Sequence, residues 1–97
     1  MTKPLIIGHR GASGYEPENT LRAFSHAITQ GVDMIELDVH LCASGELVVI
    51  HDETIDRTTN GHGYVSRLSL TELKKFDAGK GERIPTLEEV IFATRGK

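Results

Sequence analysis

Two carboxylates separated by one residue are the part of this 97-residue sequence best suited to chemistry. Glu36 and Asp38 alternate with apolar residues in the segment 34–41, which predicts a strand with both acids on one face. Ionised carboxylates this close repel one another, and a bound cation would remove the repulsion. Ligation by oxygen alone favours Mg²⁺ or Ca²⁺ over zinc. The alternative is that both acids lie on the solvent face of a sheet and pair with arginines.

Two histidines close predicted strands near these acids. His9 ends the first apolar run of the chain, with Arg10 directly after it, and His51 ends the run that follows the acids. Functional groups gather at the carboxyl ends of parallel strands, so we expect His9, Glu36 and Asp38 to share one rim. An imidazole has an ordinary pKa of about 6.5, which suits a general acid or base. The guanidinium of Arg10 suits a phosphate or a carboxylate.

A strand and a helix are predicted before the acids. The apolar run 4–9 indicates a buried strand, and the segment 17–31 has helical spacing of its apolar residues. Pro17 and Asn19 suit the start of this helix, and Gly31 suits its end. The sequence therefore predicts that a helix connects the first strand to the strand that carries the acids.

A hairpin is predicted after the acids. The next apolar run, 47–50, follows a loop too short for a crossover to a parallel neighbour, so the chain returns antiparallel. A turn centred near Ser44 places Asp38 about opposite Ile50 and His51. The hairpin thus brings an acid and a histidine together.

Two capping boxes predict two further helices. Ser69 and Glu72 precede a short one, and Thr86 and Glu89 begin another, whose apolar stripe is Leu87, Val90 and Ile91. The order strand, helix, strand, helix indicates an α/β protein with parallel strands, in which the hairpin and the short helix are inserted after the second strand. Such a unit leaves open sheet edges, through which the chain could self-associate.

The composition excludes several classes of protein. A net charge of −3 and a pI near 5.9 give no basic stripe for binding nucleic acid. Cys42 is the only cysteine, so there is no intrachain disulfide, and a reducing compartment is the simpler interpretation. The apolar run at the start is too short for a signal peptide or a membrane span. These features predict a soluble, cytoplasmic protein.

Four segments carry a resemblance to a known family. They are GHRGASGYEPENTLRAF, GVDMIELDVHLCASGELVVIHDETIDRTTNGHGYV, LSLTELKKFDAG and IPTLEEV, which together make up nearly the whole chain. In their order and spacing the chain resembles the glycerophosphodiester phosphodiesterases. We therefore expect the fold and chemistry of that family to apply to the part of the barrel that this chain contains.

The resemblance implies a (β/α)₈ TIM-type barrel and a small-molecule substrate. It implies hydrolysis of glycerophosphodiesters to glycerol 3-phosphate and an alcohol, with a divalent cation, Mg²⁺ or Ca²⁺. By position in the matching motifs, it implies that His9 and His51 are the acid/base pair. It also implies that Glu36 and Asp38 are metal ligands and that Arg10 contacts the phosphate.

The sequence departs from the family in its length. A closed barrel of this type takes about 250 residues, so the chain is similar to its amino-terminal part, an incomplete domain over 1–97 with the family's insertion at about 53–83. The family's third metal-binding glutamate and a phosphate-contacting lysine come from later strands, so we expect this chain alone to be inactive and poorly stable. Two alternatives stay open. One is a related barrel phosphodiesterase of phospholipase C or sphingomyelinase D type, and the other is a non-catalytic remnant.

Overall fold

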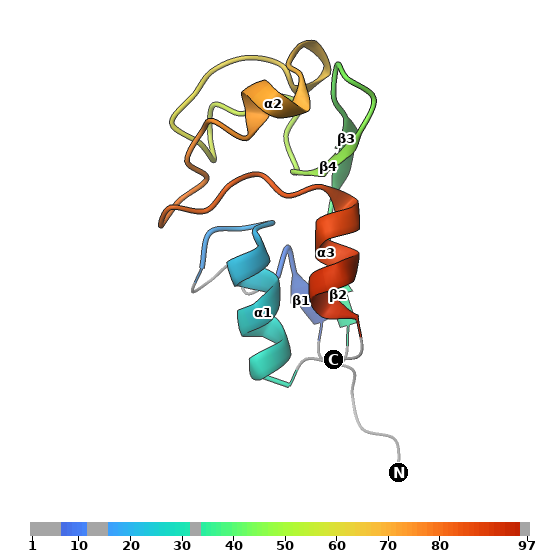
Figure 1. The fold of residues 1–97 in the computed structure, drawn as a ribbon. Coiled ribbons are helices and arrows are strands. Elements are labelled where there is room, and N and C mark those ends of the chain that lie inside the picture. Colours follow the sequence, from blue (N-terminus) through green and yellow to red (C-terminus); the bar gives the residue numbers. More distant parts are fainter. Residues whose placement is uncertain (1–6, 12–15, 32–33, 96–97) are drawn as a thin grey trace.

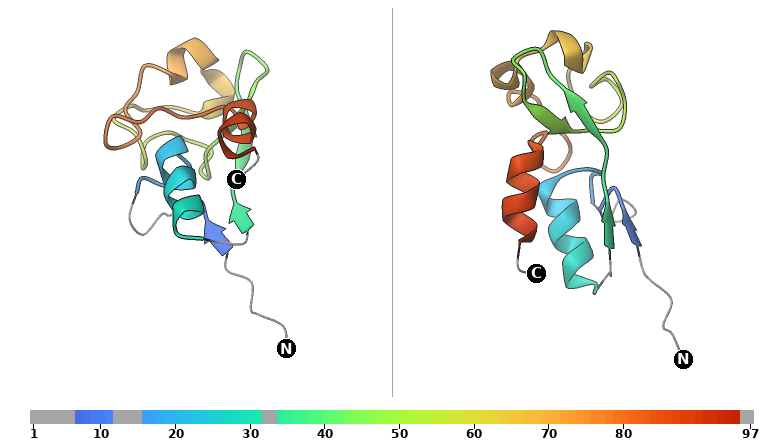
Figure 2. Two further views of the ribbon diagram at one scale, coloured as in Figure 1. Left: turned by 60° about the horizontal axis from the view of Figure 1, so that its bottom comes forward. Right: turned by 90° about the vertical axis from the view of Figure 1, so that its right-hand side faces the viewer.

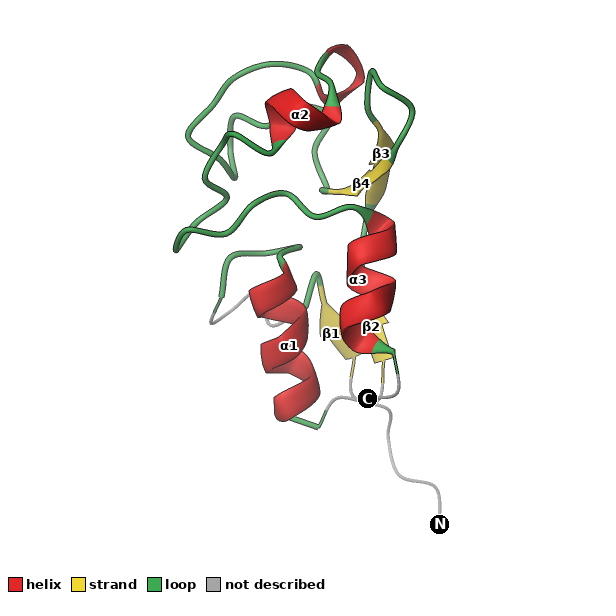
Figure 3. Ribbon diagram, in the orientation of Figure 1, coloured by secondary structure: helices red, strands yellow, loops and turns green. Residues whose placement is uncertain are grey.

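The chain folds into an α/β unit with a compact insertion above it (Figure 1). The computed structural model describes residues 7–11, 16–31 and 34–95. Figure 3 shows short helices and strands joined by long loops. The elements are β1 (Ile7–His9), α1 (Leu21–Thr29), β2 (Met34–Glu36), β3 (Val39–Leu41), β4 (Leu47–Val49), a 3₁₀ turn (Val65–Arg67), α2 (Leu70–Leu73) and α3 (Leu87–Thr94).

β1 and β2 form a parallel pair, as the sequence predicts. Ile7 lies opposite Met34, and His9 lies opposite Glu36. Helix α1 connects the two strands, and α1 and α3 lie side by side over the same face of the pair (Figure 2). The register brings the backbones of His9 and Glu36 to the same edge, which confirms the shared rim at the level of the backbone.

The prediction of one continuous strand over 34–41 is wrong. The extended chain is divided at Leu37 and Asp38, so that β2 pairs with β1 while β3 pairs antiparallel with β4 in a second sheet. The division has a physical reason, because the two halves take their hydrogen bonds from different partners. Beyond the division, the side chain of Leu41 is exposed, whereas Leu37 packs against the core.

The predicted hairpin register is confirmed. Leu41 lies opposite Leu47 and Val39 opposite Val49. The N–H of Ile50 then donates to the carbonyl of Asp38 at 2.9 Å, which extends the same register by one position. The hairpin therefore brings the backbone after β4 next to the acid.

Helix α1 begins later than predicted. Its N-cap is Thr20, whose hydroxyl accepts a hydrogen bond from the N–H of Ala23, rather than Pro17 or Asn19. Asn19 instead has a left-handed backbone, with φ of 55°, and belongs to the turn before the helix. The predicted end is confirmed, because Gly31 follows the C-cap with φ of 80°.

Both capping boxes are confirmed. Ser69 with Glu72 begins α2, and Thr86 with Glu89 begins α3. The predicted apolar stripe of α3 is right for the buried Val90 and wrong for Ile91, which is 56% exposed. Ile91 instead lines an open hollow beside the start of α3.

The core is divided into two clusters that meet at β4. Val48 points into the cluster beneath the hairpin and the insertion, while Val49 points into the cluster of Phe24 and Val90 between the helices and the sheet. Alternation along one strand thus joins the insertion to the strand–helix unit. Among the described residues, no helix has both the length and the apolar character needed to cross a bilayer.

Candidate functional site

A tight turn after β1 holds the first polar contacts of the site. Arg10 has a left-handed backbone, with φ of 54°, and its N–H donates to Oε1 of Glu36 at 3.2 Å. Gly11 follows with φ of 77°, and a Cβ there would lie 2.8 Å from the backbone of Ala23. Only glycine fits between the turn and α1, so this close approach sets the direction in which the Arg10 N–H points.

Asp38 is held by two side chains from the same region. Asn19 Nδ2 donates to Asp38 Oδ2 at 3.2 Å, and Arg10 Nε lies 3.5 Å from the same oxygen. The backbone N–H of Asn19 donates to the carbonyl of Arg10 at 2.9 Å, which ties the turn to the start of α1. Asn19 is therefore a positioning residue that the sequence reasoning used only as a helix start.

Both predicted metal ligands thus contact Arg10. The alternative in which the acids have an arginine partner is realised in part, and Asp38 is only a quarter exposed rather than fully on the solvent face. Among the described side chains, which do not include that of His9, no three of the types His, Cys, Asp and Glu are grouped to hold a metal ion. Glu36 and Asp38 fit a hard cation by donor type and supply two carboxylates toward it.

Two buried polar atoms beside Asp38 lack a hydrogen-bond partner among the described residues. They are Arg10 Nε and Asn19 Oδ1. Buried polar atoms are nearly always paired in folded proteins, so orphan atoms next to a carboxylate indicate a place for a further polar group. An orphan amide oxygen accepts either a hydrogen-bond donor or a cation, which agrees with the chemistry predicted from the sequence.

His51 pairs with the residue that follows it. Its Nδ1 lies 2.8 Å from Asp52 Oδ1, and hydrogen bonds from Arg57 first and His51 second hold the pKa of Asp52 well below its usual range. An ionised carboxylate only accepts hydrogen bonds, so Nδ1 carries the proton and Nε2 is the nitrogen that can exchange one. The ring is 45% exposed, which leaves room for a substrate.

His40 anchors the backbone at the same place. Its Nε2 donates to the carbonyl of His51 at 2.8 Å, across the end of the hairpin. The described hydrogen bonds do not join the side chains of Asp38 and His51, although the hairpin brings their backbones close. The side chain of His9 lies outside the described part of the structure, so its predicted contact with the site stays a prediction.

An ion-pair network connects the two sides of the site. Arg57 donates to Asp52 at 2.8 and 3.0 Å and to both oxygens of Glu18 at 2.9 Å. Glu18 also accepts from Arg10 Nη1 at 3.3 Å. The hydrogen bond from Arg57 lowers the pKa of Glu18, against the opposing effect of burial. The sequence reasoning missed Glu18, Asp52 and Arg57, because their partners are set by tertiary structure.

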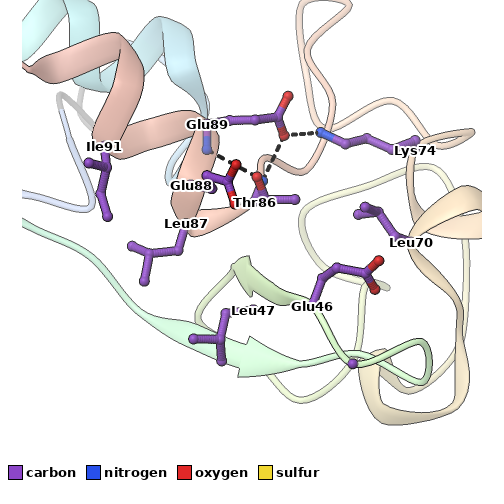
Figure 4. Close-up of a pocket in the computed structure, with 10 residues that line it drawn as sticks. Glu46, Leu47, Leu70, Lys74, Thr86, Leu87, Glu88, Glu89 and Ile91 are labelled. Atoms are coloured by element: carbon purple, nitrogen blue, oxygen red, sulfur yellow. Dashed lines mark hydrogen bonds and ion pairs between the residues drawn. The ribbon is translucent and has the colours of Figure 1, made fainter.

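A wide hollow of about 820 Å³ lies elsewhere, between the hairpin and the start of α3 (Figure 4). Three leucines and Ile91 line it together with three glutamates, and Lys74 forms an ion pair with Glu89 at one side. Among the described side chains predicted to do chemistry, those of Arg10, Glu36, Asp38 and His51, none lines it. The rim that holds Arg10, Glu36 and Asp38 is therefore the better candidate for a reactive site.

A parallel strand pair with a connecting helix, and with Arg10, Glu36 and Asp38 at its carboxyl end, is typical of α/β barrel enzymes. The glycerophosphoryl diester phosphodiesterase family matches residues 9–97 of the chain, and the chain therefore belongs to that family. This agrees with the resemblance noted in the sequence.

Known proteins are similar in sequence and structure. A glycerophosphodiester phosphodiesterase of Caldanaerobacter subterraneus is 58% identical over 96 residues, which are 92% of this chain and 40% of that protein. The structure of a glycerophosphodiester phosphodiesterase from Agrobacterium tumefaciens matches with a TM-score of 0.88 and 46% identity, over 92% of this chain and 42% of that one.

A third similar protein was solved with a ligand. It is a phosphodiesterase of Oleispira antarctica in complex with the product sn-glycerol-3-phosphate, which matches with a TM-score of 0.90 and 43% identity. The match covers 93% of this chain and 39% of that one. The chain thus spans between 39% and 42% of these three relatives. These likenesses confirm the predicted α/β architecture of an amino-terminal barrel portion, and the described strands do not close into a barrel.

Proposed function

We propose that a protein carrying this segment hydrolyses glycerophosphodiesters to glycerol 3-phosphate and an alcohol. The observation that carries the proposal is the convergence of Arg10, Glu36 and Asp38 at the carboxyl end of a parallel pair, in a chain of this family. The relative solved with sn-glycerol-3-phosphate supports the choice of substrate class.

Arg10 is the proposed contact for the substrate phosphate. Its guanidinium is already held from two sides by Glu18 and Asp38, so a phosphate would meet a positioned cation. Glu36 and Asp38 would hold a divalent cation, Mg²⁺ or Ca²⁺. When bound, that cation supplies a Lewis acid that lowers the pKa of a glycerol hydroxyl.

The two histidines are proposed to move the protons. In the first step a glycerol hydroxyl oxygen forms a bond to phosphorus and the bond from phosphorus to the alcohol oxygen breaks. His9 takes the proton of the attacking hydroxyl, and His51 gives its Nε2 proton to the departing alcohol. Asp52, 2.8 Å from Nδ1, stabilises His51 while the ring is charged.

Water then opens the cyclic phosphate with the roles exchanged. His51, now neutral, takes a proton from the water as the water oxygen bonds to phosphorus. His9 returns its proton to the glycerol oxygen as the ring bond breaks. Both histidines finish in the protonation states in which they began, and the product is glycerol 3-phosphate.

The segment 53–83 is proposed to cap the glycerol side of the site. Its apolar side chains, among them Ile55, Val65 and Leu73, pack on Val48 of the hairpin in one cluster. The cap is therefore fixed to β4, and His51 follows two residues after the end of that strand. In this proposal residues 1–97 form an incomplete catalytic domain with that insertion.

A substrate screen tests the proposal against its alternatives. The polypeptide assayed should carry this segment together with the other strands of a family barrel. Glycerophosphocholine and glycerophosphoinositol should be cleaved with release of glycerol 3-phosphate when Mg²⁺ or Ca²⁺ is present. Cleavage of sphingomyelin alone would favour the sphingomyelinase D alternative, and no cleavage of any of the three would favour the non-catalytic one.

Two histidine variants give a matched comparison. His51→Ala should lower kcat on the order of 10²-fold or more, the usual contribution of a positioned acid or base. His62→Ala is the control, because His62 also contacts an aspartate, Asp56 at 3.1 Å, but its side chain is 85% exposed and no described hydrogen bond joins it to Arg10, Glu36 or Asp38. Equal rates in the two variants would remove His51 from the mechanism.

A further inference from the structure

We propose that Arg57 is a positioning residue that couples His51 to Arg10 through Asp52 and Glu18. The proposal rests on the proposed function for the roles of His51 and Arg10, and on the hydrogen bonds of the described residues for the coupling itself. It gives the inserted segment a second task besides capping, because Arg57 belongs to that segment. The orientation of the proposed phosphate contact and of the proposed proton donor would then depend on one guanidinium.

The geometry of Arg57 fits a bridge rather than a single ion pair. Its Nε and Nη2 donate to Asp52 at 2.8 and 3.0 Å, while Nη1 and Nη2 donate to Glu18 at 2.9 Å each. Both contacts are bidentate, which fixes the plane of each carboxylate as well as its position. A lysine ammonium has no such planar fork and cannot hold both planes at once.

The bridge joins segments that are far apart in the sequence. Glu18 lies 39 residues from Arg57 and just before α1, while Asp52 lies five residues away at the end of the hairpin. Beyond these carboxylates, Glu18 accepts from Arg10 Nη1 and Asp52 accepts from His51 Nδ1. A continuous series of charged hydrogen bonds therefore runs from the proposed phosphate contact to the proposed proton donor.

The two ends of the network, His51 and Arg10, are oriented by their contacts with carboxylates. The side chain of His51 is 45% exposed, so packing alone does not fix its ring, and the contact with Asp52 does. Arg10 leaves a left-handed backbone and its guanidinium is directed by Glu18 and Asp38. Arg57 is itself half-exposed, and exposed ion pairs add little to stability. Its effect is therefore on orientation.

The experiment measures the coupling without substrate, by nuclear magnetic resonance of a ¹⁵N-labelled polypeptide that carries this segment within a family barrel. Asp52→Asn perturbs one end of the network, and the Nε–Hε signal of Arg10 reports on the other. We expect Asp52→Asn to shift that signal in the wild-type background, and the shift to be lost in the background of Arg57→Lys. The control background is Arg67→Lys, in which the shift should persist, because Arg67 lies over the Tyr64 ring and outside the network.

Three results would overturn the coupling. The first is an equal shift of the Arg10 signal in all three backgrounds, and the second is no shift in the wild-type background. The third is loss of signal dispersion in Arg57→Lys, because Arg57 would then be a residue needed for folding. None of these results depends on catalysis, so the phosphodiesterase assignment could survive them, and a failed substrate assay would leave the coupling result intact.

Discussion

Replacing Gly11 with alanine tests whether the turn that carries Arg10 is as tightly packed as the structure indicates. An added Cβ would lie 2.8 Å from the carbonyl carbon of Ala23 and 2.9 Å from its Cβ, with φ at +77°. The left-handed backbone costs an L-residue roughly 1–2 kcal/mol and the overlap roughly 1–3 kcal/mol, together about 2–5 kcal/mol. A small domain has a free energy of unfolding of only about 5–15 kcal/mol, so the loss is large.

Gly31→Ala is the matched control for this substitution. Gly31 has nearly the same φ, +80°, but a Cβ there meets nothing within 4 Å. It should lose only the backbone cost of roughly 1–2 kcal/mol. The gain from reducing the entropy of the unfolded chain is common to both variants and cancels in their difference.

Urea denaturation followed by circular dichroism measures that difference. With a slope of about 2 kcal/mol/M, an overlap of about 2 kcal/mol lowers the midpoint of Gly11→Ala by about 1 M relative to Gly31→Ala. Equal midpoints for the two variants would refute the close approach of the turn to α1. In that case this contact could not be what directs the Arg10 N–H toward Glu36.

Three further predictions concern stability and association. The pKa of Glu16 is lowered to about 2 from 4.5, first by Lys80 and then by Arg22, so its stabilising effect is present above pH 4.5 and lost as the pH falls toward 2. Glu16→Gln should therefore flatten the acid dependence of the urea midpoint in that window, and an unchanged dependence would contradict the ion pairs. Thr86→Ala should destabilise the chain by about 1 kcal/mol through loss of the N-cap of α3, whereas the exposed Thr71→Ala should not. The wild-type chain should self-associate in sedimentation experiments, because Phe92 is 75% exposed and the sheets have open edges, and a monomer at all concentrations would contradict this.

Local signals in the sequence predicted much of the fold. The capping boxes at Ser69 and Thr86 act within one turn of helix, and both are present. The hairpin register follows from a short loop and alternating side chains, and Val39 lies opposite Val49 as expected. Each of these features depends on residues a few positions apart, which is why the sequence alone was sufficient.

Features that depend on distant partners could not be predicted. The strand is divided at Leu37 and Asp38 because β1 pairs with the segment before the division and β4 pairs with the segment after it. Helical spacing predicts which residues share a face of α3, but it does not predict which of them other elements cover, and Ile91 is left exposed. The site shows the same limit, since the bidentate contacts of Arg57 join residues 39 positions apart.

Release of glycerol 3-phosphate from glycerophosphocholine tests the proposed phosphodiesterase activity and the metal role of Asp38 together. The assay uses a polypeptide that carries this segment within a family barrel, with Mg²⁺, with Ca²⁺ and with a chelator, and it compares the wild type with Asp38→Ala. Asp56→Ala serves as the control, because Asp56 is a half-exposed carboxylate of the insertion that pairs with His62. We predict metal-dependent release by the wild type and by Asp56→Ala, with loss of release in Asp38→Ala. Chelator-resistant release by Asp38→Ala at the wild-type rate would contradict both the metal dependence and the role of Asp38 as a ligand.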